Sequence, residues 1–331
     1  MIGNGIIGNG IRRTFVLAGL KAKEKTTLKN YFCQYKKWKN YADSEGIVPL
    51  PTSSELVGEF LILSVERNSL QVIKQVMAGI NYFHRLFGFE VPCGEFHGGL
   101  VNDYINKHTK KPCRNIEPIL ISHIEKVFNC FDFEKCSLYF LRSLGILIIG
   151  FFGFLRFGEM RNLLTSDICF EQDCVKICIR NSKTDKLRKG QYVRFDNGSF
   201  PAKFLVMYFR RFQFVVGNDE KNVLFMSMKK DSKGRALIHL KEKMSYNSFS
   251  RVLKQLFDMA GIPSKYFRLH SLRIGGASEA SRLGVPDFKV GVNGRWQSDR
   301  SRILYQRDPA IGPDSVSRVL SDGFRSSRVF R

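Results

Sequence analysis

The chain has 331 residues, which is long enough for two domains, and its 44% hydrophobic and 25% charged residues are ordinary for a globular protein. Its charge is unusual, because 53 lysine and arginine residues against 30 aspartate and glutamate residues give a formal net charge of +23. Such an excess indicates a polyanionic partner, of which nucleic acid is the commonest. A membrane partner is disfavoured, because every basic amphipathic helix in the chain is better used to form a core.

The eight cysteines carry no metal-site pattern. No two of them have Cys-x-x-Cys spacing, and no histidine lies near Cys174 and Cys178 at zinc-ligand spacing. The first residues lack the apolar core of a secretory signal. We therefore expect reduced thiols in an intracellular protein, nuclear if the source is a eukaryote.

Glycine density predicts that residues 1–23, which repeat the tetrapeptide IGNG, are a disordered tail. Residues 24–109 then carry apolar side chains at helical spacing. Helices are predicted at 26–44, after the turn PLPTSS, at 68–87 and near 100–108. This stretch is predicted to be a compact helical domain whose aromatic residues belong to the core rather than to a base-stacking surface.

A basic linker is predicted at residues 110–118, where Lys110, Lys111, Pro112 and Pro118 disrupt helix. Two domains joined in this way could close around a duplex like a clamp. The second domain is predicted to comprise residues 119–331.

Residues 119–331 mix helical and strand patterns. Helical periodicity predicts helices at 119–128, 136–149, 201–216 and 248–261. The apolar run 143–155 has 13 residues, short of the roughly 20 that span a bilayer, so a buried helix is expected. Alternation at 174–180 and a returning strand at 192–195 predict a β-hairpin. A short strand is also expected at 222–226, and a loop or weak hairpin at 229–243. The predicted fold class is mainly α with a small β-sheet.

Two pairs of side chains in this domain lie three residues apart and so share a helix face: Arg156 with Glu159, and His270 with Arg273. The second pair can face one small anion. Tyr305 follows in SDRSRILYQR, a short basic helix that Ser298 could cap. A tyrosine brought from a separate helix to an arginine and histidine cluster suggests a nucleophile for a phosphate. The alternative is a buried helix with a hydrogen-bonded histidine and an unrelated surface tyrosine.

In this order, these residues resemble the tyrosine recombinases, also called the phage integrase family. The resemblance covers residues 25–310 and rests on the segments GFLRFGEM, NSKTDK, HSLRIG and GRWQSDRSRILY. Lys183 follows Arg156 by 27 residues, Trp296 follows Arg273 by 23, and Tyr305 follows Trp296 by 9, all within the family's usual range. HSLRIGGAS and a tryptophan at 296 resemble recombinases of eukaryotic mobile elements more than bacterial chromosome-resolving enzymes.

The resemblance implies a site-specific DNA recombinase or integrase that breaks and rejoins double-stranded DNA through a 3′-phosphotyrosine intermediate. It implies a core-binding domain at residues 24–109, a catalytic domain at 119–331 and a homotetramer in the synaptic complex. No cofactor, metal or small-molecule ligand is expected, since arginines can supply the positive charge. The implied catalytic residues are Arg156, Lys183, His270, Arg273, Trp296 and Tyr305, with Glu159 in support.

The chemistry accounts for these residue types. Arginine offers a planar fork of donors to the charged phosphate of the transition state. His270 is the expected base for the tyrosine hydroxyl, whose ordinary pKa is about 10. Lys183 is the expected acid for the leaving 5′-oxygen, with Lys186 as the alternative. Trp296 could donate its indole N–H to phosphate, and Glu159 either orients an arginine or fixes the helix.

Three other functions fit part of the pattern. A type IB topoisomerase has a similar catalytic set, but the helical N-terminal domain and the compact size favour a recombinase. A catalytically inactive DNA-binding derivative is disfavoured by the intact set of residues. A purely structural basic scaffold accounts for the charge and leaves the spacing unexplained.

Overall fold

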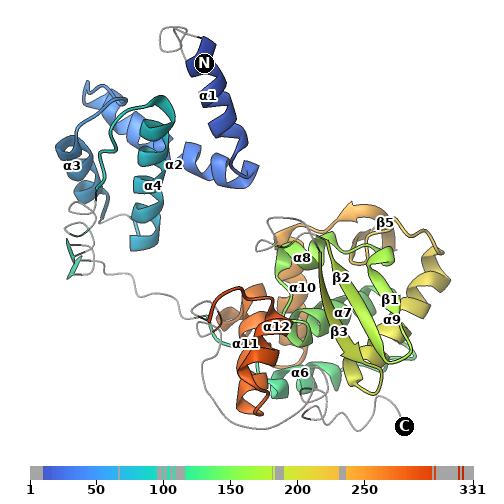
Figure 1. Cartoon of the computed structure of the whole chain (residues 1–331). Coiled ribbons are helices and arrows are strands. Elements are labelled where there is room, and N and C mark those ends of the chain that lie inside the picture. The colour runs from blue at the N-terminus through green and yellow to red at the C-terminus, as the bar shows by residue number, and fades with distance from the viewer. Residues whose placement is uncertain are drawn as a thin grey trace. The chain divides into compact units, whose positions relative to one another are not determined.

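A computed structural model of the chain describes residues 10–65, 68–94, 99, 103–104, 107–108, 116–180, 182, 190–230, 236–299, 302, 320 and 323. The chain divides into two compact units, residues 1–114 and 115–331 (Figure 1). The division falls inside residues 110–118, where the linker is predicted. Residues 110–115 lie outside the described residues, so the linker stays a prediction.

The N-terminal unit is helical. Its long described helices are α1 (Gly10–Lys21), α2 (Lys25–Ser44), α3 (Ser54–Val65) and α4 (Leu70–Phe87). Trp38 of α2 is fully buried, and its indole N–H donates to the carbonyl of Pro49 at 2.9 Å. α4 ends at Gly88, whose φ of 79° suits glycine. The helices predicted at 26–44, after PLPTSS and at 68–87 are confirmed, whereas most of residues 100–108 lie outside the described residues.

Helix α1 corrects the prediction of a disordered tail. Residues 1–9 lie outside the described residues, but from Gly10 the chain is helical. Glycine is dense only up to that point, and the following segment contains Arg12, Arg13, Leu17 and Ala18, which have high helix propensity. Gly19 lets α1 approach α4 closely, since a Cβ there would lie 2.5 Å from Leu86 Cδ1 and its carbonyl accepts from Tyr82 Oη at 3.1 Å.

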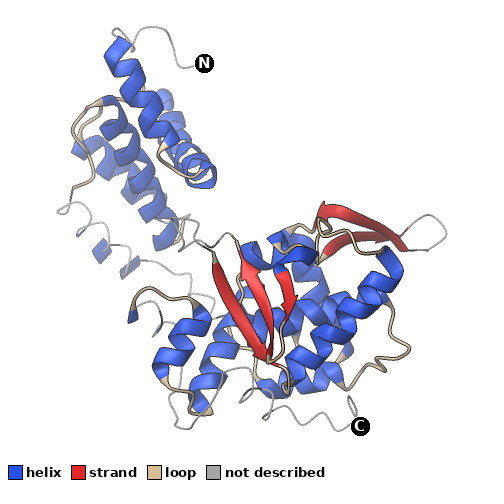
Figure 2. Ribbon diagram, turned by 45° about the vertical axis from the view of Figure 1, so that its right-hand side comes forward, coloured by secondary structure: helices blue, strands red, loops and turns tan. Residues whose placement is uncertain are grey.

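The C-terminal unit combines helices with two small antiparallel sheets (Figure 2). Its helices are α6 (Ile121–Phe128), α7 (Leu138–Phe152), α8 (Phe157–Asn162), α9 (Phe200–Val216), α10 (Tyr246–Met259), α11 (Leu269–Arg282) and α12 (Asp287–Gly294). Two short 3₁₀ turns lie at Thr165–Asp167 and Ser264–Tyr266. The predicted fold class, mainly α with a small β-sheet, is confirmed.

The larger sheet has the order β1-β2-β3, formed by β1 (Ile168–Phe170), β2 (Cys174–Ile179) and β3 (Gln191–Asp196). The predicted hairpin is confirmed, and Val175, Ile177 and Ile179 are buried on one face as their alternation requires. β1 was not predicted, because three residues are too few to show an alternating pattern.

A second hairpin pairs β4 (Met226–Lys230) with β5 (Ala236–Lys243). The described residues of 229–243 therefore belong to the strands of a hairpin. The strand predicted at 222–226 is wrong except for Met226. Residues 222–225 are buried and form only an isolated bridge, between Val223 and Leu164, so their apolar character reflects burial rather than a ladder.

Helix α7 is the centre of this unit's core. Every residue from Leu141 to Phe152 is buried, so the apolar run is a buried helix as predicted. It contacts α9 and α11. Among the described residues, no helix is both long enough and apolar enough to cross a membrane.

Candidate active site

Glu159 links two arginines in a buried ion-pair network. Arg156 precedes the first residue of α8, and Glu159, three residues later, reaches back to it. Glu159 Oε2 accepts from the Arg156 backbone N–H at 2.9 Å, and Oε1 accepts from Arg156 Nη1 at 2.8 Å. Ser182 Oγ donates to the same Oε1 at 3.0 Å. Arg156 and Glu159 are therefore neighbours as predicted, but Arg156 is extended at the start of α8 (φ −78°, ψ 156°) rather than helical, so the two meet as an ion pair and not on a shared helix face.

Arg295 is the second arginine of this network, and the sequence prediction missed it. It follows α12 with φ 56° and is buried. Its Nη2 donates to Glu159 Oε2 at 2.9 Å, across 136 positions of sequence. The one feature of the sequence that could have identified Arg295 is its position directly before Trp296, in GRWQS.

The charge of Arg295 is the main reason that Glu159 stays ionised. Burial alone would raise the pKa of this carboxyl. The charge of Arg295, the Arg156 N–H bond and the charges of Arg156 and Arg273 outweigh burial, and the pKa lies below its usual range. Glu159 is therefore a carboxylate at neutral pH, able to hold both arginines.

Arg273 donates hydrogen bonds to two backbone carbonyls. It lies on α11 and is fully buried. Nη1 donates to the carbonyl of Phe154, and Nη2 donates to the carbonyl of Gly294 at 2.5 Å. The guanidinium carbon lies 4.4 Å from the centre of the Trp296 ring, in cation–π contact. These contacts fix the orientation of the Arg273 guanidinium, whose charge also helps to lower the pKa of Glu159.

His270 lies one helical turn before Arg273 on α11, and its side chain is exposed. Protein atoms around the ring displace water and lower the pKa of His270, and the charges of Arg273 and Arg156 lower it further. The imidazole is therefore neutral at neutral pH and can accept a proton.

Trp296 packs against Phe154, in the turn that follows α7. Its ring centre lies 6.2 Å from that of Phe154 and faces Arg273. A Cβ on Gly294 would lie only 1.9 Å from Trp296 Cζ3, so the glycine is needed for the ring to fold back over α12. The structure therefore brings together Arg156, Glu159, His270, Arg273 and Trp296.

The remaining predicted residues, Lys183, Lys186 and Tyr305, lie outside the described residues. Near the end of the described chain, the carbonyl of Ser298 accepts from the Arg302 N–H at 3.2 Å, as in a helical turn. Arg302 pairs with Asp287 of α12 at 3.2 Å and with Asp299 at 3.1 Å. An ion pair therefore ties Arg302 to α12.

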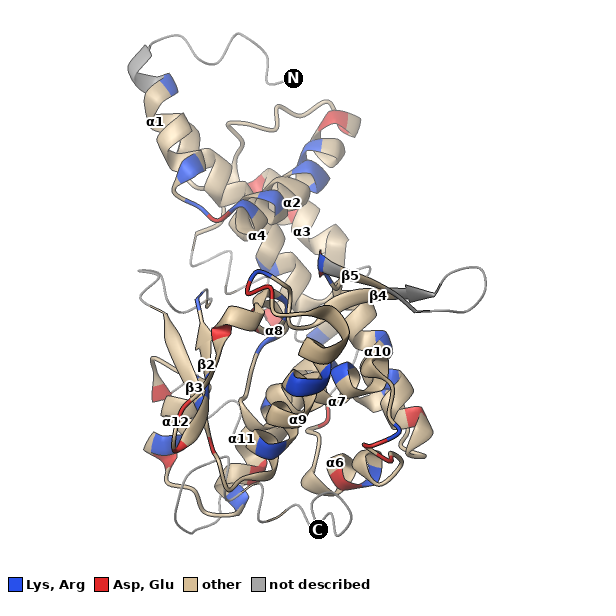
Figure 3. Ribbon diagram, turned by 90° about the vertical axis from the view of Figure 1, so that its right-hand side faces the viewer, with Lys and Arg blue, Asp and Glu red and all other residues tan. Residues whose placement is uncertain are grey.

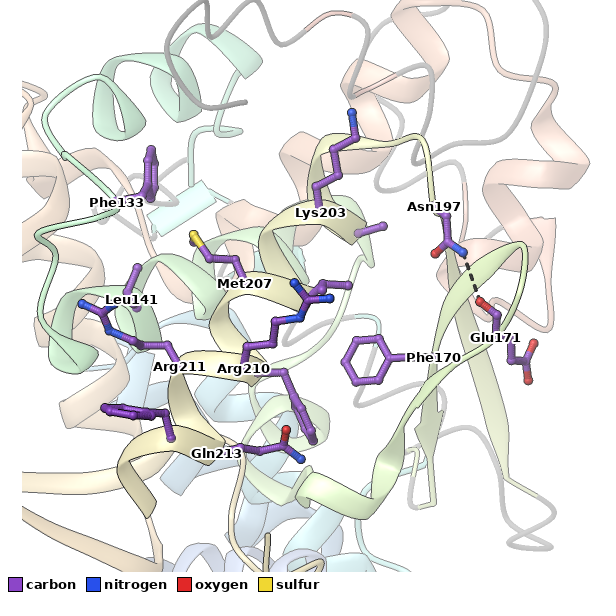
Figure 4. A pocket seen from close by; sticks show the side chains of 14 residues that line it. Phe133, Leu141, Phe170, Glu171, Asn197, Lys203, Met207, Arg210, Arg211 and Gln213 are labelled. Atoms are coloured by element: carbon purple, nitrogen blue, oxygen red, sulfur yellow. Dashed lines mark hydrogen bonds between the residues drawn. The ribbon is translucent and has the colours of Figure 1, made fainter. Parts of the chain in front are cut away.

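A groove of about 1040 Å³ lies elsewhere in this unit, along α9 (Figure 4). Phe133, Phe170 and Met207 line it, with Arg210 and Arg211 among its basic groups. It shares none of its lining residues with the arginine cluster, so we do not assign it to the active site.

Comparisons with known proteins agree on one family. Residues 138–309, more than half of the chain, match the phage integrase family. An integrase/recombinase XerD homologue from Selenomonas ruminantium is 22% identical over 299 residues, which cover 89% of this chain and 85% of the relative.

Two solved structures share the fold. The XerH site-specific recombinase in a post-cleavage complex with its palindromic difH substrate has a TM-score of 0.59 at 14% identity, covering 92% of this chain and 87% of XerH. A lambda integrase dimer bound to a COC′ core site has a TM-score of 0.54 at 14% identity, covering 92% of this chain and 96% of the integrase chain. The finer resemblance to recombinases of eukaryotic mobile elements stays a prediction. The chain belongs to the phage integrase family and is a site-specific tyrosine recombinase.

Proposed function

We propose that this recombinase cleaves and rejoins double-stranded DNA through a 3′-phosphotyrosine intermediate, with Tyr305 as the nucleophile. The observation that carries the proposal is the cluster of Arg156, Arg273 and neutral His270 around the turn at Phe154. Three arginines and one glutamate leave this cluster with two net positive charges. Such preorganised charge suits the phosphate of a phosphodiester under attack.

Arg156 and Arg273 are the proposed phosphate ligands. Among the described residues, only Glu159 bonds to the Arg156 guanidinium, and it does so through Nη1. The other edge of the fork remains for a phosphate oxygen. Arg273 is covered in this conformation, so its contact with phosphate requires the atoms that cover it to move.

His270 is the proposed general base. In its neutral form it can take the proton from Tyr305 Oη as the oxygen attacks phosphorus. Lys183, or Lys186 in the same loop, would protonate the leaving 5′-oxygen. Trp296 would donate its indole N–H to phosphate and hold Arg273 in place. The phosphotyrosine bond conserves the energy of the broken phosphodiester, so rejoining needs neither ATP nor a metal.

The helical N-terminal unit is the proposed DNA clamp. All five lysines of α2 are exposed: Lys25, Lys29, Lys36, Lys37 and Lys39. Figure 3 shows basic positions along this helix in blue. These lysines contribute to the positive charge with which the protein would neutralise the phosphates of a bound duplex. We further propose that four copies of the chain assemble on two recombining sites.

Covalent trapping tests this function. Nicked duplexes that carry candidate sites, taken from the DNA flanking the gene, are incubated with the chain and separated on a denaturing gel. A protein–DNA adduct is expected, and it should be absent with Tyr305→Phe. Duplex affinity should hardly change, because phosphate contacts supply most of it. Adducts formed normally by Tyr305→Phe would refute the assignment of the nucleophile.

A further inference from the structure

Arg295 occupies a backbone position that is unusual for its side chain. Its φ of 56° and ψ of 40° lie in the left-handed region, which residues other than glycine rarely adopt. Its side chain is also buried, with 2% of its surface exposed. A charged residue persists in such a place when the surrounding contacts determine it.

The guanidinium of Arg295 spans four acceptors. Nη1 donates to the carbonyls of Asn293 at 2.7 Å and Gly153 at 3.1 Å. Nη2 donates to the carbonyl of Phe154 at 3.1 Å and to Glu159 Oε2 at 2.9 Å. Only the planar fork of arginine can reach four acceptors arranged in this way.

These contacts converge on the segment that leads into Arg156. Gly153 and Phe154 form the turn between α7 and Arg156, and Phe154 has a positive φ of 51°. Arg273 also donates to the Phe154 carbonyl. Arg295 therefore ties the turn that carries one proposed phosphate ligand to the carbonyl that anchors the other.

The Glu159 carboxylate accepts as many hydrogen bonds as its two oxygens can hold. Each carboxylate oxygen accepts two hydrogen bonds, Oε1 from Arg156 Nη1 and Ser182, and Oε2 from Arg156 N–H and Arg295. A carboxylate accepts about four such bonds. Without Arg295, Oε2 would lose a charged donor, and the carboxylate would be left with Arg156 as its one ion-pair partner among the described residues. It would then draw Arg156 inward, away from a phosphate.

We propose that Arg295 is a positioning residue for DNA cleavage, which acts on the phosphate through Glu159 and Arg156. The inference rests on the proposed function and adds a residue to it. Arg295 itself touches neither the phosphate nor the nucleophile in this role.

A double-mutant cycle tests the inference. The single-turnover rate of adduct formation is measured at saturating protein, on a nicked duplex that the parent chain cleaves. Arg295→Lys should lower this rate about tenfold or more, because a displaced Arg156 misaligns the phosphate. In an Arg156→Ala background, Arg295→Lys should lower the rate of adduct formation by no more than about twofold, because the residue through which Arg295 acts is already missing. The duplex Kd should stay within about twofold in both backgrounds.

Arg282→Lys is the matched control. Arg282 also forks onto a buried glutamate, with Nε 2.9 Å from Glu279 Oε1 and Nη2 3.0 Å from Oε2. It lies at the far end of α11 from His270. Its replacement should leave the rate within about twofold of the parent in either background.

The outcomes are distinct. An equal loss from Arg295→Lys in both backgrounds, or an unchanged rate in the parent, would overturn the positioning role while leaving the proposed function intact. Adducts that persist with Tyr305→Phe would instead remove the proposed function.

Should Arg295→Lys fail to fold, a second cycle replaces the first. Arg295→Gln combined with Glu159→Gln removes both buried charges together, which avoids an uncompensated one. This pair should cleave at the rate of Glu159→Gln alone, within about twofold. A further loss of about tenfold in the pair would show that Arg295 acts by a route other than Glu159, and would overturn the inference.

Discussion

At the scale of single residues, the carbonyl of Phe154 organises the site. It accepts from Arg273 Nη1 and from Arg295 Nη2, so two buried guanidinium groups meet at one neutral oxygen. Backbone carbonyls thus orient Arg273, whereas the carboxylate of Glu159 holds Arg156.

We expect Arg273→Lys to lower the single-turnover cleavage rate by roughly a hundredfold or more, as for other losses of preorganised charge stabilisation. One ammonium group cannot bond both Phe154 and Gly294 while it lies over Trp296. Quenched-flow or gel-based adduct kinetics would measure the loss. Arg268→Lys is the control, because Arg268 also bonds two carbonyls, of Lys265 and Phe267, without belonging to the cluster. Wild-type kinetics for Arg273→Lys would contradict its role.

His270 leads to a prediction about pH. A general base works while it is unprotonated, and protein atoms, Arg273 and Arg156 hold the pKa of His270 below its ordinary 6.5. Cleavage should therefore persist as pH falls through 6.5 and decline only below it. Arg156→Ala removes one of the lowering charges, so the acid limb of its residual activity should move to higher pH. An acid limb centred above 6.5 in the parent chain would argue against His270 as the base.

At the scale of elements, the position of α11 depends on two glycines that follow Arg273. A Cβ on Gly275 would lie 1.9 Å from the carbonyl oxygen of Ile119, and one on Gly276 would lie 2.0 Å from that of Phe151. α11 therefore packs directly on the backbone of α7 at Gly276 and on the segment before α6 at Gly275. This close approach brings Arg273 within reach of the Phe154 carbonyl.

Gly276→Ala should consequently separate α11 from α7. We expect a loss of about 1–3 kcal/mol in the free energy of unfolding, as for other overpacked sites, and slower cleavage because Arg273 is displaced. Thermal unfolding followed by circular dichroism would measure the stability. Gly158→Ala on α8 is the control, since a Cβ at this position would have no atom within 4 Å, and alanine there should stabilise slightly. Equal melting temperatures for the two variants would disprove the packing argument.

At the scale of the whole molecule, we expect the net charge of +23 to contribute more to duplex affinity than any single contact. Each phosphate that the protein neutralises releases counterions from the duplex. We expect the logarithm of duplex affinity to fall steeply and linearly with the logarithm of salt concentration, as fluorescence anisotropy titrations would show. Affinity that is nearly independent of salt would mean that the basic excess serves another partner.

Cleavage should also proceed in EDTA, because arginines, rather than a divalent ion, are proposed to stabilise the phosphate. Adduct formation with and without the chelator is the measurement. Complete inhibition by EDTA that magnesium reverses would indicate a metal-dependent nuclease and count against the tyrosine mechanism.

The sequence alone determined the features that depend on local spacing. Helical periodicity predicted α2, α4, α6 and α7, and alternation predicted the β2–β3 hairpin, because each pattern lies within one continuous segment. Three-residue spacing likewise predicted that Arg156 and Glu159 are neighbours, although they meet as an ion pair rather than on a shared helix face. The order and separations of the four motif segments were enough to recognise the family.

Only the tertiary structure decided which distant groups meet. Arg295 and Glu159 are separated by 136 positions, and no local period encodes their contact. The short strand β1 likewise depends on its partner strand β2. The lowered pKa values of His270 and Glu159 arise from charges and burial that exist only once α7, α8, α11 and α12 are packed together, since electrostatic energies depend on distance in space rather than along the chain.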